Sequence, residues 1–179
     1  ILFGGAGAAL AGSATWDLNP ATKNWNMAAN WTPDIVPNGP TDTATFGVSN
    51  KKNISISAAT ALEGVVFNAG ASDFTLTVTA PSSLFISGTG VTNNSGVKQS
   101  FFTDTDRFRN QANITFVGSA TAGDATYTNF GGRVRNGFGG HVEFFNTATA
   151  GTGTFVIGGG GVSQADGAAT PLLLITGET

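Results

Sequence analysis

The amino-acid sequence predicts an all-β protein and, more specifically, a β-solenoid that resembles a parallel β-helix and carries a Trp- and Pro-rich N-terminal cap. Three observations lead to this prediction. Apolar and polar residues alternate with a period of two, helical periodicity is almost absent, and the chain repeats itself with an offset of 28 residues, as from Phe116 to Phe144. Strand-and-turn repeats of this length indicate stacked coils, because one coil cannot bury its inward face alone. A β-sandwich or jelly roll, which also has short strands at regular spacing, is the alternative.

Residues 1–15 form an apolar N-terminal segment, which opens with ILFGGAGAAL. We interpret it as an assembly tail or as the remnant of a signal peptide, because Ala9-Leu10-Ala11 fits the small-x-small cleavage rule. The segment is too short and too rich in glycine to span a membrane. We therefore expect a secreted or cell-surface protein without a membrane span.

Residues 16–42 predict a cap for one end of the solenoid. All tryptophans of the chain lie there: Trp16, Trp25 and Trp31. Their irregular spacing does not fit one face of a strand, but a Pro- and Asn-rich loop can fold them over the apolar core that a solenoid exposes at its end. Pro33, Pro37 and Pro40 keep the next stretch extended and unpaired, so the first strand is expected near Thr43. The alternative role is that exposed Trp25 or Trp31 rings stack on a sugar.

This segment and the strands after it resemble a known class of proteins. The order W-D-L-N-P, N-W-N, A-A-N-W-T-P and V-P-N-G-P-T-D-T-A-T-F is followed by GVVFNAGASDFTLTV and ISGTGVTNNSG. This order resembles the opening of large secreted bacterial β-helical proteins that carry autotransporter-associated β-strand repeats, over about residues 14–96. The resemblance implies an extracellular or surface-attached β-solenoid without catalytic residues.

Residues 43–179 contain the predicted strands of the solenoid. In residues 73–80, DFTLTVTA, Phe74, Leu76 and Val78 alternate with threonines, which suits a strand with one buried and one hydrated face. The full set of expected strands is 43–48, 53–58, 64–68, 73–80, 83–87, 97–102, 113–117, 126–130, 142–146, 154–157 and 172–176. Gly, Asn, Asp or Ser residues separate them, as is typical of turns.

The internal repeat is clearest in the second half of the chain. Residues 114–132 align without gaps to residues 142–160, and eight of nineteen positions are identical. Residues 65–76 form a shorter copy, and 172–177 are expected to open another. Asparagines are expected at coil corners that need a positive φ, and the candidates are Asn68, Asn93, Asn94 and Asn146.

The composition does not favour chemistry on a substrate. Charged residues make up 11% of the chain and its net charge is −3, so eight scattered Lys and Arg residues cannot neutralise a row of phosphates, and no nucleic-acid partner is expected. We predict no catalytic residue, no cofactor and no metal site. His141 is expected at the surface, and Glu143 is expected to face solvent.

Two other polar stretches receive structural interpretations. Asp104 and Asp106 lack the Gly and the distal Glu of a calcium loop, so Asp106 is expected to pair with Arg107 or Arg109. Arg133 and Arg135 lie between glycines and are expected in a hydrated turn.

The apolar ends of the chain predict assembly. Low charge, solenoid character and apolar termini together favour a secreted, non-enzymatic structural protein that assembles head to tail into an extracellular filament or sheath. The expected partner is therefore a second copy of the chain, with a cell-surface polysaccharide as a further candidate. The predicted assembly residues are Ile1, Leu2, Phe3, Leu10, Leu172, Leu173, Leu174 and Ile175. A surface adhesin or carbohydrate-binding module is the alternative function, and a polysaccharide-degrading enzyme is the third.

Overall fold

The chain folds into a β-solenoid of about 6 turns. The structure is a computed structural model that describes the backbone of residues 12–158, 162–167 and 170–176 and the side chains of residues 12–158. A single short 3₁₀ helix, η1 (Ala28–Asn30), is the helical element of this described part. The all-β class and the solenoid predicted from the sequence are thus confirmed, and the sandwich alternative is not adopted.

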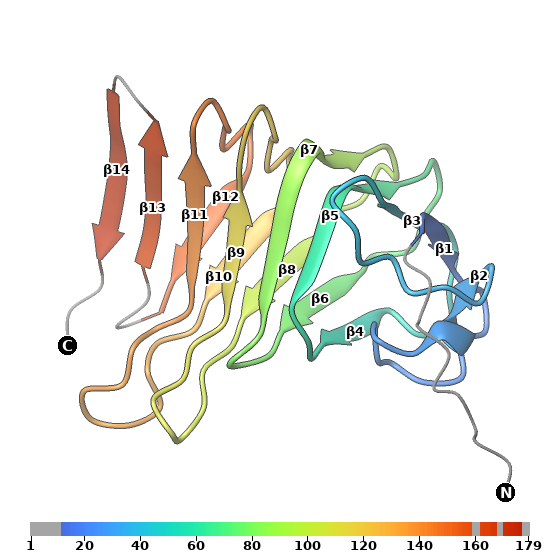
Figure 1. Cartoon of the computed structure of the whole chain (residues 1–179), viewed down its shortest axis with the longest axis horizontal. Coiled ribbons are helices and arrows are strands. Elements are labelled where there is room, and N and C mark those ends of the chain that lie inside the picture. The colour runs from blue at the N-terminus through green and yellow to red at the C-terminus, as the bar shows by residue number, and fades with distance from the viewer. Residues whose placement is uncertain (1–11, 159–161, 168–169, 177–179) are drawn as a thin grey trace, which may run out of the picture.

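The coils contribute strands to two sheets that lie face to face (Figure 1). The long sheet contains β1 (Ala14–Trp16), β2 (Trp31–Thr32), β3 (Thr43–Phe46), β5 (Thr60–Phe67), β7 (Ser83–Asn93), β9 (Asn113–Phe116), β11 (His141–Phe145), β13 (Val162–Gly167) and β14 (Thr170–Thr176), in the order β14-β13-β11-β9-β7-β5-β3-β1-β2. The short sheet contains β4 (Asn53–Ile56), β6 (Thr75–Val78), β8 (Ser100–Thr103), β10 (Thr126–Asn129) and β12 (Thr154–Ile157), in the order β12-β10-β8-β6-β4. Neighbours from successive coils run parallel in both sheets, as stacked coils require.

The 28-residue repeat is the stacking register of two successive coils. Phe116 of β9 pairs with Phe144 of β11, and Thr126 of β10 pairs with Thr154 of β12, so both pairs are 28 residues apart. The repeated glycines Gly123 and Gly151 both have a positive φ, of 65° and 58°. A Cβ on Gly123 would lie 2.5 Å from the carbonyl oxygen of Val91 in the preceding coil, so the corner needs glycine for space as well as for its backbone angle.

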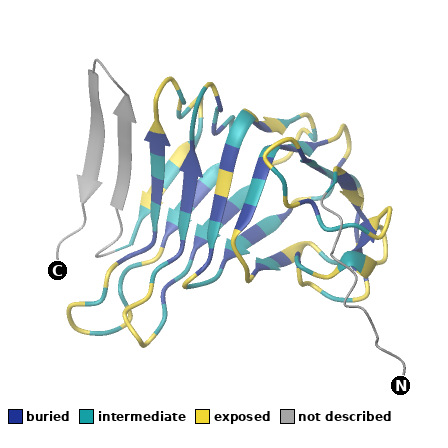
Figure 2. Cartoon of the chain, viewed as in Figure 1, coloured by how far each residue is buried: buried dark blue, intermediate teal, exposed yellow. Residues whose placement is uncertain are grey.

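The core lies between the two sheets, whose strands carry the buried residues (Figure 2), and it contains columns of apolar side chains from successive coils. On the short sheet, paired inward positions form one such column: Ile54, Leu76, Phe101, Tyr127 and Phe155. The ring of Tyr127 is stacked between Phe101 and Phe155, with centroid distances of 5.0 and 5.1 Å. Because each strand alternates inward and outward residues, the period-two pattern of the sequence places these rings inside.

Two expectations about individual elements are wrong, and one strand was missed. The first strand does not begin near Thr43, because β1 pairs in parallel with β3 and β2 pairs antiparallel with β1. The strand at 172–176 exists within β14, but it opens no further coil, because β14 runs antiparallel to β13. The unpredicted strand β13 is the next coil of the long sheet, and it pairs in parallel with β11.

Asparagine corners are confirmed at one of the four expected positions. Asn146 has a φ of 59°. Asn68, Asn93 and Asn94 are not among the described non-glycine residues with a positive φ. The side-chain amide of Asn93 instead donates a hydrogen bond to the carbonyl of Val97, 2.9 Å away, and so closes its turn by a side-chain contact.

Candidate functional site

The N-terminal end of the solenoid is closed by the three tryptophans. Trp16 and Trp31 are paired residues of β1 and β2, and their rings meet edge to face with centroids 5.0 Å apart. Trp25 lies against Trp31 at 4.7 Å, and all three rings contact Phe46 of the first full coil. Each indole N–H donates to a main-chain carbonyl, those of Lys51, Pro37 and Trp25 respectively. The cluster therefore covers the end of the apolar core with no indole donor left unpaired.

The same segment also covers the first edge of the short sheet. Ser55 of β4 exchanges two backbone hydrogen bonds of 2.9 Å with Lys23 and Trp25. The side chain of Asn26 accepts from the N–H of Ser57, one step further along the edge. The fully buried Asn30 side chain holds the covering loop in place through Thr22 and Asn24. Main-chain groups at the edge of β4 are thus bonded within the chain, which prevents them from pairing with another molecule.

The tryptophans do not offer a sugar-binding surface. Trp25 is 0% exposed and Trp31 is 1% exposed, so neither ring presents a face to solvent. The alternative role of Trp25 and Trp31 in sugar stacking is therefore wrong for this arrangement, and their position corresponds to the capping role.

The C-terminal end of the short sheet differs, because β12 is its last strand. The N–H groups of Thr154 and Gly158 bond to carbonyls of the β10 coil, at 3.0 and 2.8 Å. In a parallel pair, alternate residues direct their main-chain groups to the same side, so those of Phe155 and Ile157 point to the other edge. No strand in the described part of the chain pairs with that edge. Phe155 is half-buried and Val156 is 47% exposed, so the open edge is also apolar.

The side chains of the predicted assembly residues lie outside the described part of the chain. Ile1, Leu2, Phe3 and Leu10 lie outside the described residues. The backbone of Leu172, Leu173, Leu174 and Ile175 lies in β14, the last strand of the long sheet, whose side chains are likewise outside the described part. The sequence analysis predicted the strand at 154–157 but not that its outer edge lacks a partner.

The acidic and basic side chains form isolated contacts. His141 is the first residue of β11, and its Nε2 lies 3.4 Å from Glu143. Asp104 pairs with Arg133 at 2.7 Å. Asp106 does not form the expected ion pair with Arg107 or Arg109, because its carboxylate accepts hydrogen bonds from the backbone of Phe108 and Asn110. Desolvation opposes ionisation of Asp106, but the hydrogen bonds from the Asn110 side chain and from these backbone groups, together with the nearby charge of Arg107, hold its pKa below the usual value.

No metal centre can be built from the side chains that the structure describes. Within residues 12–158, no three His, Cys, Asp or Glu side chains come together.

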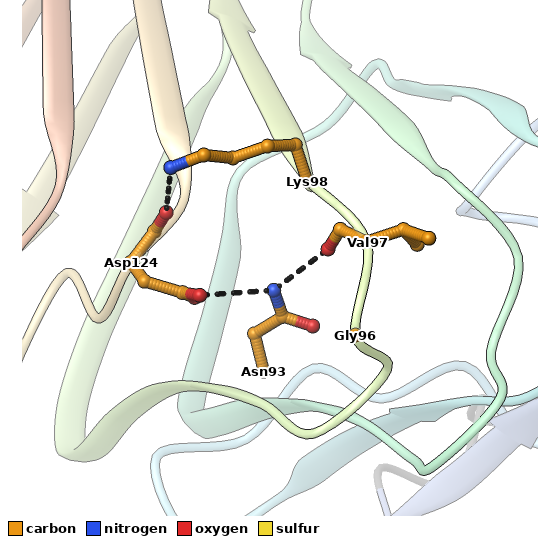
Figure 3. Close-up of a pocket in the computed structure, with 5 residues that line it drawn as sticks. All are labelled: Asn93, Gly96, Val97, Lys98 and Asp124. Carbon is orange, nitrogen blue, oxygen red and sulfur yellow. Dashed lines mark hydrogen bonds between the residues drawn. The ribbon is translucent and has the colours of Figure 1, made fainter.

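A small surface pocket of about 210 Å³ is lined by Asn93, Gly96, Val97, Lys98 and Asp124 (Figure 3). Its polar groups bond to one another: the Asn93 amide reaches Asp124 Oδ2 at 3.3 Å, and Lys98 Nζ reaches the Asp124 carbonyl at 3.1 Å. The pocket therefore has few free donors to offer a ligand.

Comparisons with known proteins identify no relative. No family model, no curated protein and no solved structure matches the chain. The described residues also contain no helix of the length and apolar character needed to cross a membrane.

Proposed function

We propose that this chain is a secreted, non-enzymatic structural protein that assembles head to tail into an extracellular filament or sheath. The open edge of β12 carries the proposal, because the opposite edge of the same sheet is closed by the chain's own N-terminal segment. Within the described residues, the two ends of the short sheet therefore present unlike surfaces. Contacts between unlike surfaces generate open fibres rather than closed dimers.

The proposed contact is β-augmentation at β12. The outward main-chain groups of Phe155 and Ile157 would bond to an extended segment of another copy, and Val156 would be covered. The proposed segment is residues 1–12 of that copy, because ILFGGAGAAL has no charge and is almost wholly apolar or glycine. Secretion is supported by the resemblance of residues 14–96 to bacterial β-helical surface proteins.

A pair of substitutions at Ile157 tests the contact. Ile157→Pro removes the N–H that points to the open edge, whereas Ile157→Ala removes most of the same side chain and keeps that N–H. We expect the wild type and Ile157→Ala to form oligomers or fibres at micromolar concentration, and Ile157→Pro to remain monomeric. Light scattering after size-exclusion chromatography and negative-stain electron microscopy measure this.

Deletion of residues 1–11 tests the proposed occupant in the same assays. The shortened chain is expected to be monomeric. It is expected to assemble again when residues 1–11 are fused back to it. A wild-type chain that stays monomeric over the whole concentration range contradicts the proposed function. Fibres that persist after the deletion contradict the tail as the occupant of the edge.

A further inference from the structure

Two neighbouring loops carry every arginine of the chain. Residues 104–112 connect β8 to β9, and residues 130–140 connect β10 to β11 in the next coil. The arginines are Arg107, Arg109, Arg133 and Arg135, and all are exposed. The loops contain two acids, Asp104 and Asp106, so their net charge is 4 − 2 = +2, whereas the rest of the chain has four Lys and nine Asp or Glu residues, 4 − 9 = −5. A local basic surface thus lies on an acidic protein.

The acids of these loops are occupied by local contacts. Arg133 binds Asp104 and fastens the second loop to the first, and Thr105 adds a 2.9 Å hydrogen bond to the carbonyl of Gly131. Asp106 accepts from the backbone of its own loop. Among the described residues, no carboxylate forms an ion pair with Arg107, Arg109 or Arg135. The charge of Arg107 acts on Asp106 without a close ion pair, so the three guanidinium groups can still bind an external anion.

Each loop also exposes a phenylalanine. Phe108 is 69% exposed and Phe138 is 67% exposed, more than any other large hydrophobic side chain of the described residues. The guanidinium carbon of Arg107 lies 5.0 Å from the centroid of the Phe108 ring, so one ring carries a cation on its face. Exposing two such rings in water is unfavourable, and their position beside free arginines indicates a contact surface.

The shape of this surface distinguishes the possible partners. Both loops project beyond the strands on the same side of the solenoid, drawn in yellow and orange in Figure 1. A projection of this kind suits a broad surface into which the rings can insert, whereas small ligands bind in concave sites. Phosphate groups suit guanidinium groups, and the zone between lipid headgroups and acyl chains accepts aromatic rings.

We propose that loops 104–112 and 130–140 dock the protein onto an anionic lipid surface. Arg107, Arg109 and Arg135 bind lipid phosphates, and Phe108 and Phe138 enter the interfacial zone. The contact is peripheral and reversible, because three cations and two rings supply far less free energy than a membrane-spanning segment. The surface shares no residue with the open edge of β12, so it does not depend on assembly.

Vesicle flotation with the full chain tests the proposal. The probes are vesicles of phosphatidylcholine alone and of phosphatidylcholine mixed with phosphatidylglycerol. We expect binding to the mixed vesicles only, with affinity that falls as salt is raised. The double variant Arg107→Gln/Arg135→Gln is expected to lower the partition coefficient about thirtyfold, which corresponds to about 1 kcal/mol per arginine. Phe108→Ser is expected to lower it about tenfold.

Matched variants control for charge and apolar surface. Lys23→Gln/Lys98→Gln removes the same charge from exposed positions outside the loops, and Val48→Ser removes another exposed apolar side chain. Both are expected to bind like the wild type. Circular dichroism and thermal melting of each variant check that the solenoid is intact, and binding by the Ile157→Pro variant separates this surface from assembly.

Several outcomes would overturn the proposal. Equal binding to both vesicle types, no binding to either, or an equal loss in the lysine control would each do so. Failure to bind vesicles together with retention on a heparin column, lost in the arginine variant, would assign the loops to an anionic polysaccharide. Loss of assembly in the loop variants would assign the loops to a second copy of the chain.

Discussion

The two ends of the short sheet differ in how the strand edge and the apolar core are covered. At the β4 end, residues 23–26 bond to the strand edge, and three buried indole rings cover the core. At the β12 end, no described strand pairs with the edge, and Phe155 is only half-buried. The difference teaches that closing a solenoid requires two things, partners for main-chain groups and a cover for the side-chain column. The N-terminal segment supplies both.

The largest loss of stability is expected from removing a side chain that closes the N-terminal end. Trp25→Ala removes a fully buried ring that contacts Trp31 and Phe46, and it frees the carbonyl of Pro37. We expect the free energy of unfolding to fall by about 3–5 kcal/mol. Phe155→Ala at the other end should cost roughly half as much, because that ring is already partly in contact with solvent. Urea denaturation followed by circular dichroism measures both variants.

Leu18→Ala is the matched control in the cap. Leu18 is 54% exposed, so its loss should change stability by no more than about 0.5 kcal/mol. If Trp25→Ala were no more costly than Leu18→Ala, the cap would not be a structural part of the solenoid.

A smaller effect is expected from the polar part of the cap. The Asn30 side chain accepts from the Thr22 N–H at 2.8 Å and donates to Thr22 Oγ1 at 2.8 Å and to the Asn24 carbonyl at 2.6 Å. Asn30→Ala removes these partly buried hydrogen bonds and should cost about 2 kcal/mol. Hydrogen exchange should become faster at the Thr22 amide, whereas the exchange rates of the β12 amides should not change. Asn94→Ala, at an exposed position, should leave exchange and stability unchanged.

The sequence could predict the repeating part of the fold because its signals are local. The β-branched and aromatic residues at 154–157 mark β12 with the observed bounds, and the identity of Phe116 and Phe144 predicts which residues stack. Stacked coils favour like side chains at like positions, so register appears as similarity.

The end structures and the loop surface could not be predicted in this way. Trp16 and Trp31 pair antiparallel across a 14-residue connection with no repeating pattern, and β14 runs antiparallel to β13 instead of continuing the parallel stack. Arg107 and Arg135 lie in separate stretches of sequence, and only the stacking of successive coils brings their loops together. Such features are set by the three-dimensional path of the chain rather than by local periodicity.

The smallest loss of stability at neutral pH is expected in the middle of the inward column of the short sheet, between its two ends. Tyr127 is fully buried between Phe101 and Phe155, and its hydroxyl donates to the carbonyl of Ala122 at 2.8 Å. Tyr127→Phe keeps the stacked ring and removes this bond, so it should cost about 1 kcal/mol.

The pH dependence of the same residue gives a sharper test. Burial, with a smaller contribution from the charge of Asp124, raises the pKa of Tyr127 well above its ordinary value of 10.0. The neutral hydroxyl therefore stabilises the folded state fully below the unfolded pKa, and this contribution is lost as the pH rises from there toward the folded pKa. The stability gap between wild type and Tyr127→Phe should narrow and then reverse in alkaline solution. Because Tyr127 is the one tyrosine of the chain, ultraviolet titration follows it alone, and ionisation at an ordinary pKa in the folded protein would show that the aromatic column is open to water at its centre.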